Sequence, residues 1–236
     1  MIRWAAAALI AAAPGAEAPN HVDLPEGAIA YLPAGLSPAP PLMVVLHGAG
    51  EGPRGMIARL RAEADRRGVV LLAPRAAGRT WDMVLDRTRA TDPLRRGAVT
   101  AARLTVDPPR IRRAVAALSA HVRVDGSRVA IAGFSDGASY ALTIGATSAS
   151  LFTCVIAFSP GMAFVPAGER PQQRVFVAHG TRDAVLSYKA TATRFVPHLR
   201  SHGSPVVLHT FDGGHIVPPA VAAAAFAYWL DRKEPA

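Results

Sequence analysis

The stretch Gly133-Phe134-Ser135-Asp136-Gly137 decides the fold because of the two segments that flank it. It follows the apolar run 129–132, which is typical of a short buried strand, and it precedes residues 138–146, which are typical of a helix. A G-x-S-x-G sequence at a strand-to-helix junction indicates a nucleophile elbow, a sharp turn that exposes the serine hydroxyl. Ser135 is therefore the candidate nucleophile, and the helix after it points backbone amides toward the reacting oxygen.

The composition indicates a single globular domain. The chain has 236 residues, of which 50% are hydrophobic and 18% are charged, so it can bury a sizeable core. The net charge of +9 is carried almost entirely by arginine. A basic surface could attract an anionic polymer or lipid, but no basic run is interleaved with aromatic residues. We therefore favour solvated arginine-rich helix faces and expect no nucleic-acid partner.

The N-terminus predicts export. A positively charged start and a short apolar stretch are followed by Ala16-Glu17-Ala18, a small-x-small cleavage site. The apolar stretch is too short to span a membrane, so no stable membrane insertion is expected. Pro14 and Pro19 weaken the pattern. We predict a signal peptide over residues 1–18, a single domain over 19–236, and a secreted or periplasmic protein; a cytoplasmic protein is the alternative.

Strand-length apolar runs alternate with segments of helical periodicity. The runs are nearly continuously hydrophobic, as in strands buried on both faces of a parallel sheet; they are residues 42–46, 69–73, 129–132, 155–158, 175–178 and 206–211. Helical patterns cover residues 56–67, 109–122, 187–201 and 219–232, and Pro197 predicts a kink or break in the third of these. This alternation predicts an α/β fold with a mostly parallel, doubly wound sheet. The arginine-rich segment 78–108 is expected to be a long loop beside the site.

A serine nucleophile needs a histidine base, and the histidine needs a carboxylate that fixes its tautomer. Downstream of Ser135, Asp183 follows one predicted strand and His215 follows another within a glycine-rich turn. The order Ser, acid, His fits the elbow, and both residues lie at strand ends, where open α/β sheets build their sites. Asp212 is an alternative acid, although it is close to His215 in sequence. His179 is interpreted as a structural histidine.

An early strand ends at Leu46-His47-Gly48-Ala49-Gly50, a second candidate part of the site. Its glycines allow the backbone to approach a substrate oxygen, so we expect an oxyanion hole formed by the amides of Ala49 and Asp136, with Gly50 as the alternative to Ala49. His47 is expected to brace this loop. Trp81 either lines the substrate pocket or packs internally. The single cysteine, Cys154, excludes an intrachain disulfide, and no cluster of His and carboxylate residues predicts a metal site.

Four motifs together, residues 46–50, 133–137, 179–183 and 213–215, resemble those of the α/β-hydrolase serine esterases. The resemblance is to the phospholipase/carboxylesterase group and its polyhydroxybutyrate-depolymerase-like relatives, and it extends from Leu42 to Leu230. It implies an α/β-hydrolase fold without a large cap domain, a Ser135–Asp183–His215 triad, an acyl-enzyme intermediate and no cofactor. Expected substrates are small or oligomeric esters with short to medium acyl chains. Polyester depolymerase, thioesterase, peptidase and a silent binding fold remain alternatives, and the segment 78–108 matches no motif of the family.

Overall fold

The computed structural model describes residues 20–82, 104–148, 150–163, 165 and 173–231. The predicted signal peptide over residues 1–18 lies outside the described residues. Residues 83–103, which make up most of the predicted long loop over 78–108, also lie outside the described residues.

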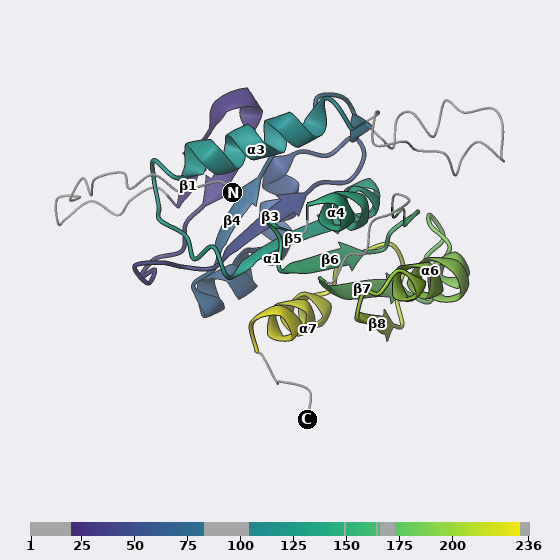
Figure 1. The fold of residues 1–236 in the computed structure, drawn as a ribbon. Coiled ribbons are helices and arrows are strands. Elements are labelled where there is room, and N and C mark those ends of the chain that lie inside the picture. Colours follow the sequence, from purple (N-terminus) through teal and green to yellow (C-terminus); the bar gives the residue numbers. More distant parts are fainter. Residues whose placement is uncertain (1–19, 83–103, 149, 164, 166–172, 232–236) are drawn as a thin grey trace.

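An eight-stranded sheet forms the centre of the described chain (Figure 1), in the order β1-β2-β4-β3-β5-β6-β7-β8. Six strands run parallel, as the sequence predicts: β4 (Val70–Ala73), β3 (Leu42–Leu46), β5 (Val129–Phe134), β6 (Cys154–Phe158), β7 (Arg174–Gly180) and β8 (Val206–Phe211). Two antiparallel strands extend one edge, β1 (His21–Asp23) and β2 (Ile29–Tyr31), joined by the 3-10 turn η1 (Pro25–Gly27). The sequence did not reveal these two strands, because three residues are too few to show a periodicity.

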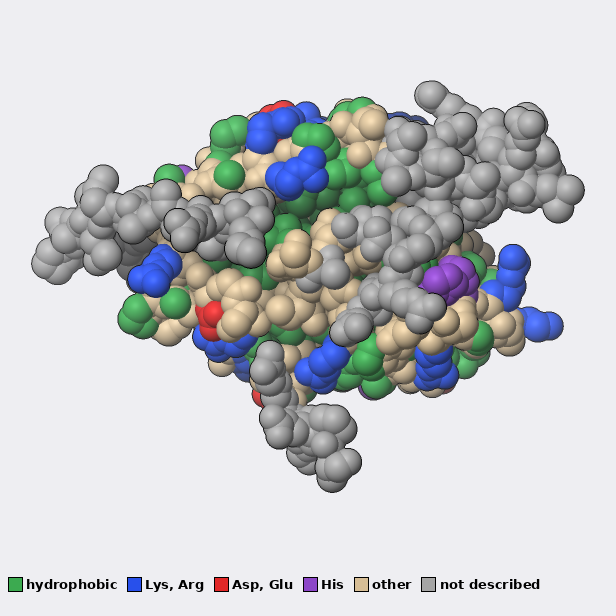
Figure 2. All heavy atoms as spheres, in the orientation of Figure 1, with side chains coloured by type: hydrophobic (Ala, Val, Ile, Leu, Met, Phe, Trp, Pro, Cys, Tyr) green, Lys and Arg blue, Asp and Glu red, His purple; other side chains and the backbone are tan. Residues whose placement is uncertain are grey.

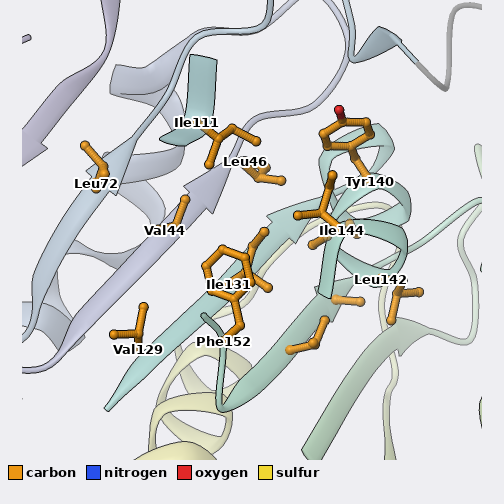
Figure 3. Packing of buried hydrophobic residues seen from close by; sticks show 14 of the residues in the cluster. Val44, Leu46, Leu72, Ile111, Val129, Ile131, Tyr140, Leu142, Ile144 and Phe152 are labelled. Carbon is orange, nitrogen blue, oxygen red and sulfur yellow. The ribbon is translucent and has the colours of Figure 1, made fainter. Parts of the chain in front are cut away.

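Helices cover both faces of the sheet, which confirms the doubly wound architecture. Along β3, Val44 and Leu46 belong to the core shared with α3 (Asp107–Leu118), α4 (Asp136–Thr147) and α6 (Val196–Ser201). Met43 and Val45 belong to the opposite core, which contains α1 (Pro53–Arg67) and α7 (Pro219–Leu230). Figure 3 shows the first of these cores, with the β3 and β5 side chains packed toward α3 and α4. Successive strand residues face opposite layers, so both layers require apolar side chains.

The predicted break at Pro197 is a change of helix type. The Ser187 hydroxyl caps the start of α5 (Tyr188–Ala190), and a π-helix, η4 (Thr191–Phe195), connects α5 to α6 without interruption. In this π turn the Val196 N–H donates to the Thr191 carbonyl oxygen, one residue further back than in an α-helix. Pro197 has no N–H to donate, and the wider turn before it accommodates the missing hydrogen bond.

The described residues add no separate cap domain to this sheet. None of their helices is both long enough and apolar enough to cross a bilayer. On the face shown in Figure 2, the lysine and arginine side chains stand in separate groups among polar and apolar ones.

Two helical glycines give opposite predictions for the same substitution. A Cβ atom at Gly145 in α4 would lie 2.3 Å from Val155 Cγ2, whereas at Gly55 in α1 it would meet only the flexible ends of Arg59 and Glu51. Gly145→Ala should lower the free energy of unfolding by about 1–3 kcal/mol through overpacking. Gly55→Ala should raise it by about 0.5–1 kcal/mol through helix propensity. Urea unfolding of both variants checks this, and equal effects of the two substitutions would contradict the packing of α4 on β6.

Candidate active site

Ser135 occupies a strained turn between β5 and α4. Its backbone angles are φ 58° and ψ −119°, a region that residues with a side chain rarely adopt, and its N–H donates to the Phe158 carbonyl oxygen at 2.9 Å. The turn requires glycine on both sides. A Cβ atom at Gly133 would lie 2.1 Å from the Gly137 carbonyl oxygen, and one at Gly137 would lie 2.2 Å from the Leu46 carbonyl oxygen. The elbow predicted from the sequence is therefore present.

Asp183 and His215 meet at the carboxyl ends of β7 and β8. His215 Nδ1 lies 2.7 Å from Asp183 Oδ2. An ionised carboxylate only accepts hydrogen bonds, so Nδ1 carries the proton and donates, which leaves Nε2 unprotonated in the neutral ring. The His215 side chain retains 15% of its exposure, whereas the Asp183 side chain is fully buried. This pair can present an imidazole nitrogen as a base at the protein surface.

A tight turn holds the Asp183 carboxylate in place. The backbone N–H groups of Val185 and Leu186 both donate to Asp183 Oδ1 at 2.9 Å. Burial by itself raises the pKa of Asp183, but the hydrogen bonds from Leu186, His215 and Val185 outweigh it and bring the pKa below its ordinary value. Asp183 is therefore ionised whenever His215 needs a counter-charge.

The loops that carry the acid and the base are fastened to each other. The Arg182 N–H donates to the Gly213 carbonyl oxygen at 3.0 Å, and a Cβ atom at Gly180 would lie only 2.3 Å from that same oxygen. The alternative acid, Asp212, pairs instead with Arg182 at 2.8 Å, and both of these side chains are largely exposed. The geometry therefore favours Asp183 over Asp212 as the partner of His215.

The loop after β3 passes directly beside the elbow. A Cβ atom at Gly48 would lie 3.4 Å from Ser135 Cβ, so the backbone that follows can reach an oxygen bound at Ser135. The Gly50 N–H donates to the Arg79 carbonyl oxygen at 2.7 Å, which makes Gly50 unsuitable as an oxyanion donor. The Ala49 N–H has no acceptor in the described part of the chain. Asp136 is the first residue of α4, where the helix itself leaves the N–H unused.

Of the two roles considered for Trp81, internal packing is the one that its contacts support. Its side chain is fully buried; Nε1 donates to the His47 carbonyl oxygen at 2.9 Å, and the ring stacks on Tyr140 with centroids 5.1 Å apart. Tryptophan suits this position because its large ring fills the buried space against Tyr140 and its single N–H bonds to the His47 carbonyl oxygen. The neighbouring Thr80 hydroxyl donates to Asp136 Oδ2 at 2.9 Å. Residues 80 and 81 thus support both the loop after β3 and the elbow.

His47 braces the loop, as expected. The Ala76 N–H donates to His47 Nε2 at 3.2 Å, so Nε2 accepts and Nδ1 carries the proton that is donated to the Gly48 carbonyl oxygen at 2.8 Å. Both ring nitrogens are occupied, which leaves none for proton transfer. Burial lowers the pKa of His47, although the hydrogen bond to Gly48 opposes the shift. The neutral ring is the one that fits this loop.

Two contacts of the site were not predicted from the sequence. The Phe134 ring contacts both the His215 ring, with centroids 4.7 Å apart, and the Arg59 guanidinium, which is 4.8 Å from the Phe134 centroid. Arg59 also forms a bidentate pair with Glu51. These residues come from four separate segments, and no local sequence pattern connects them. Phe134 therefore supports the base in addition to occupying the second position of the elbow motif.

A second unpredicted network joins residues 82 and 107, which are far apart in the sequence. The Asp82 N–H donates to Asp107 Oδ2 at 2.7 Å, and the Asp107 N–H donates back to Asp82 Oδ2 at 3.2 Å. The Tyr140 hydroxyl of α4 donates to Asp82 Oδ1 at 2.8 Å. We call Asp82, Asp107 and Tyr140 the neck. Among the described residues, no group of three or more His, Cys, Asp or Glu side chains is placed to hold a metal ion.

Acidification should weaken the fold through His47. Because the pKa of His47 is below 6.5 in the folded chain, the unfolded chain takes up the proton first as the pH falls. The stability that neutral His47 contributes is therefore complete above about pH 6.5 and is lost below it. His47→Gln should make the free energy of unfolding fall less between pH 7 and pH 5 than in the wild type. Urea titrations at several pH values measure this difference.

His121→Gln, at an exposed histidine just after α3, is the matched control and should retain the wild-type pH dependence. If His47→Gln keeps the wild-type pH dependence, the protonation of His47 does not contribute to the loss of stability at low pH.

Known proteins of the same fold have been solved. Esterase PE8 is 24% identical and covers 84% of this chain and 94% of its own, with a TM-score of 0.64. The phospholipase/carboxylesterase from Dyadobacter fermentans is 18% identical over 88% of this chain and 96% of its own, with a TM-score of 0.60. A dienelactone hydrolase-like promiscuous phosphotriesterase, P91, from metagenomic libraries is 24% identical over 84% and 81% of the two chains, with a TM-score of 0.61. At these identities the likeness shows the fold alone.

No curated protein sequence matches the chain. The family model described as Phospholipase/Carboxylesterase matches residues 29–224, which include the elbow, the loop after β3 and the Asp183–His215 pair. The chain therefore belongs to the phospholipase/carboxylesterase family and has the α/β-hydrolase fold.

Proposed function

We propose that this protein is a serine hydrolase that cleaves carboxylic esters through an acyl-enzyme intermediate. The observation that carries the proposal is the 2.7 Å contact between His215 Nδ1 and Asp183 Oδ2, at the same sheet edge as a serine in a strained strand-to-helix turn. Membership of the phospholipase/carboxylesterase family supports the same reaction class. Ser135 is the nucleophile, His215 is the general base, and Asp183 orients the imidazole.

In the first half of the reaction, His215 Nε2 takes the hydroxyl proton of Ser135 while Oγ forms a bond to the ester carbonyl carbon. The ester C–O bond then breaks, and the proton on Nε2 passes to the leaving alcohol. In the second half, water repeats the sequence on the acyl-serine and releases the carboxylic acid. The ionised Asp183 stabilises the imidazolium that forms in both halves.

The amides of Ala49 and Asp136 form the proposed oxyanion hole. Both lie beside Ser135, one on the loop after β3 and the other at the first position of α4. Within the described part of the chain, neither amide needs to break an intramolecular hydrogen bond before it binds the carbonyl oxygen. The Thr80–Asp136 and Trp81–His47 hydrogen bonds hold the two amide-bearing segments in place before substrate arrives.

The acyl part of the substrate is proposed to be of short to medium length. Two exposed apolar side chains stand next to the acid and the base: Val185 is 67% exposed and Ile216 is 53% exposed. They offer a limited apolar surface beside the reacting bond, which suits short to medium chains. A small-molecule or oligomeric ester is therefore the proposed partner. The likeness to polyhydroxybutyrate-depolymerase-like esterases, and the thioester and amide alternatives, remain predictions that substrate panels must test.

The triad variants test the catalytic assignment. Ser135→Ala and His215→Ala should each lower kcat/KM for p-nitrophenyl butyrate by on the order of 10⁴-fold, with unchanged unfolding curves. Asp183→Asn should be similarly severe, because the amide favours the wrong imidazole tautomer. Asp212→Asn is the matched control and should change kcat/KM by less than about twofold, because its ion pair is exposed. A larger loss in Asp212→Asn than in Asp183→Asn would overturn the choice of acid.

A series of p-nitrophenyl esters from acetate to palmitate tests the size of the acyl site. We expect turnover that depends on Ser135 to be highest for acyl chains of about two to eight carbons, since the described residues offer only a small apolar surface next to the site. Thioester and anilide analogues of the best chain complete the panel. Preference for the thioester or the anilide over the ester would replace the proposed reaction by one of the alternatives.

We also propose that the protein is exported. The predicted cleavage after Ala18 rests on the positively charged start, the short apolar stretch and the Ala16-Glu17-Ala18 sequence. Mass spectrometry of the protein expressed from its full reading frame in a bacterial host should find a mature N-terminus at Pro19. A chain that retains residues 1–18 in the cytoplasm would contradict export.

A further inference from the structure

His179 is buried against the triad carboxylate. It lies near the end of β7, four positions before Asp183, and its side chain is fully buried. Its Nε2 is 3.1 Å from Asp183 Oδ2, the same oxygen that accepts the hydrogen bond from His215 Nδ1. Asp183 therefore stands between two imidazoles, one buried and one at the surface.

The hydrogen bonds of His179 determine its tautomer. Nε2 is 3.1 Å from the Leu186 carbonyl oxygen, and since a carbonyl can only accept, Nε2 carries the proton. Nδ1 is then an acceptor, and the Thr191 hydroxyl at 2.9 Å donates to it. Burial lowers the pKa of His179, which keeps the ring neutral. Nε2 thus donates to the Leu186 carbonyl oxygen, and the same polar N–H group lies in electrostatic contact with Asp183 Oδ2 at 3.1 Å.

His179 also pins the turn that carries Asp183. Its bond to the Leu186 carbonyl oxygen fixes the residue whose own N–H donates to Asp183 Oδ1 at 2.9 Å. The chain of contacts runs from Thr191 on the π-helix, through His179 and Asp183, to His215. Each link is buried except the last, where the His215 ring reaches the surface.

We propose that His179 is a positioning residue for the hydrolytic reaction, which holds the Asp183 carboxylate and limits how strongly that carboxylate attracts the His215 proton. The proposal rests on the proposed function of Ser135, Asp183 and His215. An apolar side chain could fill the same volume without an N–H, so packing alone does not require histidine here. With the Nε2–H removed, Oδ2 keeps His215 as its side-chain donor and becomes a stronger acceptor for it.

The effect should be visible in the pH profile. The titratable groups that face His179 are Asp183 on one side and Tyr188, whose ring lies edge-on with centroids 6.0 Å apart; His215 lies beyond the carboxylate. Replacing His179 by leucine leaves a more basic carboxylate, which stabilises the protonated form of His215. The acidic limb of the pH–kcat/KM profile should therefore move to higher pH, by about half a unit, and kcat should fall about tenfold.

The test compares three variants in the full chain with p-nitrophenyl butyrate as substrate. His179→Leu removes the N–H, His179→Gln retains a donor near the position of Nε2, and Thr191→Val removes only the hydroxyl that orients the ring. We expect His179→Gln to restore the wild-type acidic limb and at least half of the lost kcat. Thr191→Val should show a smaller shift in the same direction. His209→Leu, a histidine on β8 that packs on Phe176, is the matched control and should leave the profile unchanged.

A merely structural His179 would lower the unfolding temperature of His179→Leu while the acidic limb stays in place, and this result would overturn the proposal. If His179→Leu does not fold, Thr191→Val supplies the same readout. The signal of the His215 Nδ1 proton, measured by NMR, tests the proposal without turnover and should move further downfield in His179→Leu. A wild type with no turnover that depends on Ser135 would contradict the proposed function alone, and an unmoved Nδ1 signal would contradict the role of His179 alone.

Discussion

The rest of the site depends on one steric constraint, the close approach of the α4 N-terminus to the ends of β5 and β3. Gly137 lies so near the Leu46 carbonyl oxygen that a Cβ atom would be 2.2 Å from it, and Gly133 meets Gly137 at a similar distance. This approach places Ser135 in a left-handed backbone conformation and brings the loop after β3 next to it. The nucleophile and the candidate oxyanion amides are thus placed by the same backbone contact. Two buried helix–sheet cores hold the strained turn in position.

Around this turn, buried polar groups are arranged so that each fixes the proton of its neighbour. The amide of Ala76 forces His47 into one tautomer, and the carbonyl of Leu186 forces His179 into the other. Each ring is restricted to one tautomer, because both of its nitrogen atoms already have a complementary hydrogen-bond partner. Asp183, by contrast, is kept ionised by several donors despite its burial. Among the described residues, His215 Nε2 is left without a hydrogen-bond partner, on a ring that contacts Phe134, the residue before the serine.

The strands with strong local sequence patterns could be predicted from the sequence, and so could the candidate site residues that directly follow them. The six parallel strands carry near-continuous apolar runs, and the elbow, Asp183 and His215 each follow such a run. The sequence did not decide between a pocket role and internal packing for Trp81, because an aromatic residue in a polar segment is compatible with both. Its contacts with His47 and Tyr140 come from other parts of the chain. His179 and Asp183 are four residues apart, one near the end of β7 and the other in the loop after it, and sequence periodicity does not predict a contact between them. Contacts of this kind depend on how the turn closes.

The neck has a consequence for how this protein can change. Asp82 and Asp107 bond to each other's backbone amides, and Tyr140 ties them to α4. Burial raises the pKa of Tyr140, so its hydroxyl stays protonated and keeps donating to Asp82. Hydrogen bonds between described residues thus hold residues 82 and 107 side by side. Because these contacts fix the spacing of residues 82 and 107, we expect a change in the number of residues between them to leave the strands and the elbow in place.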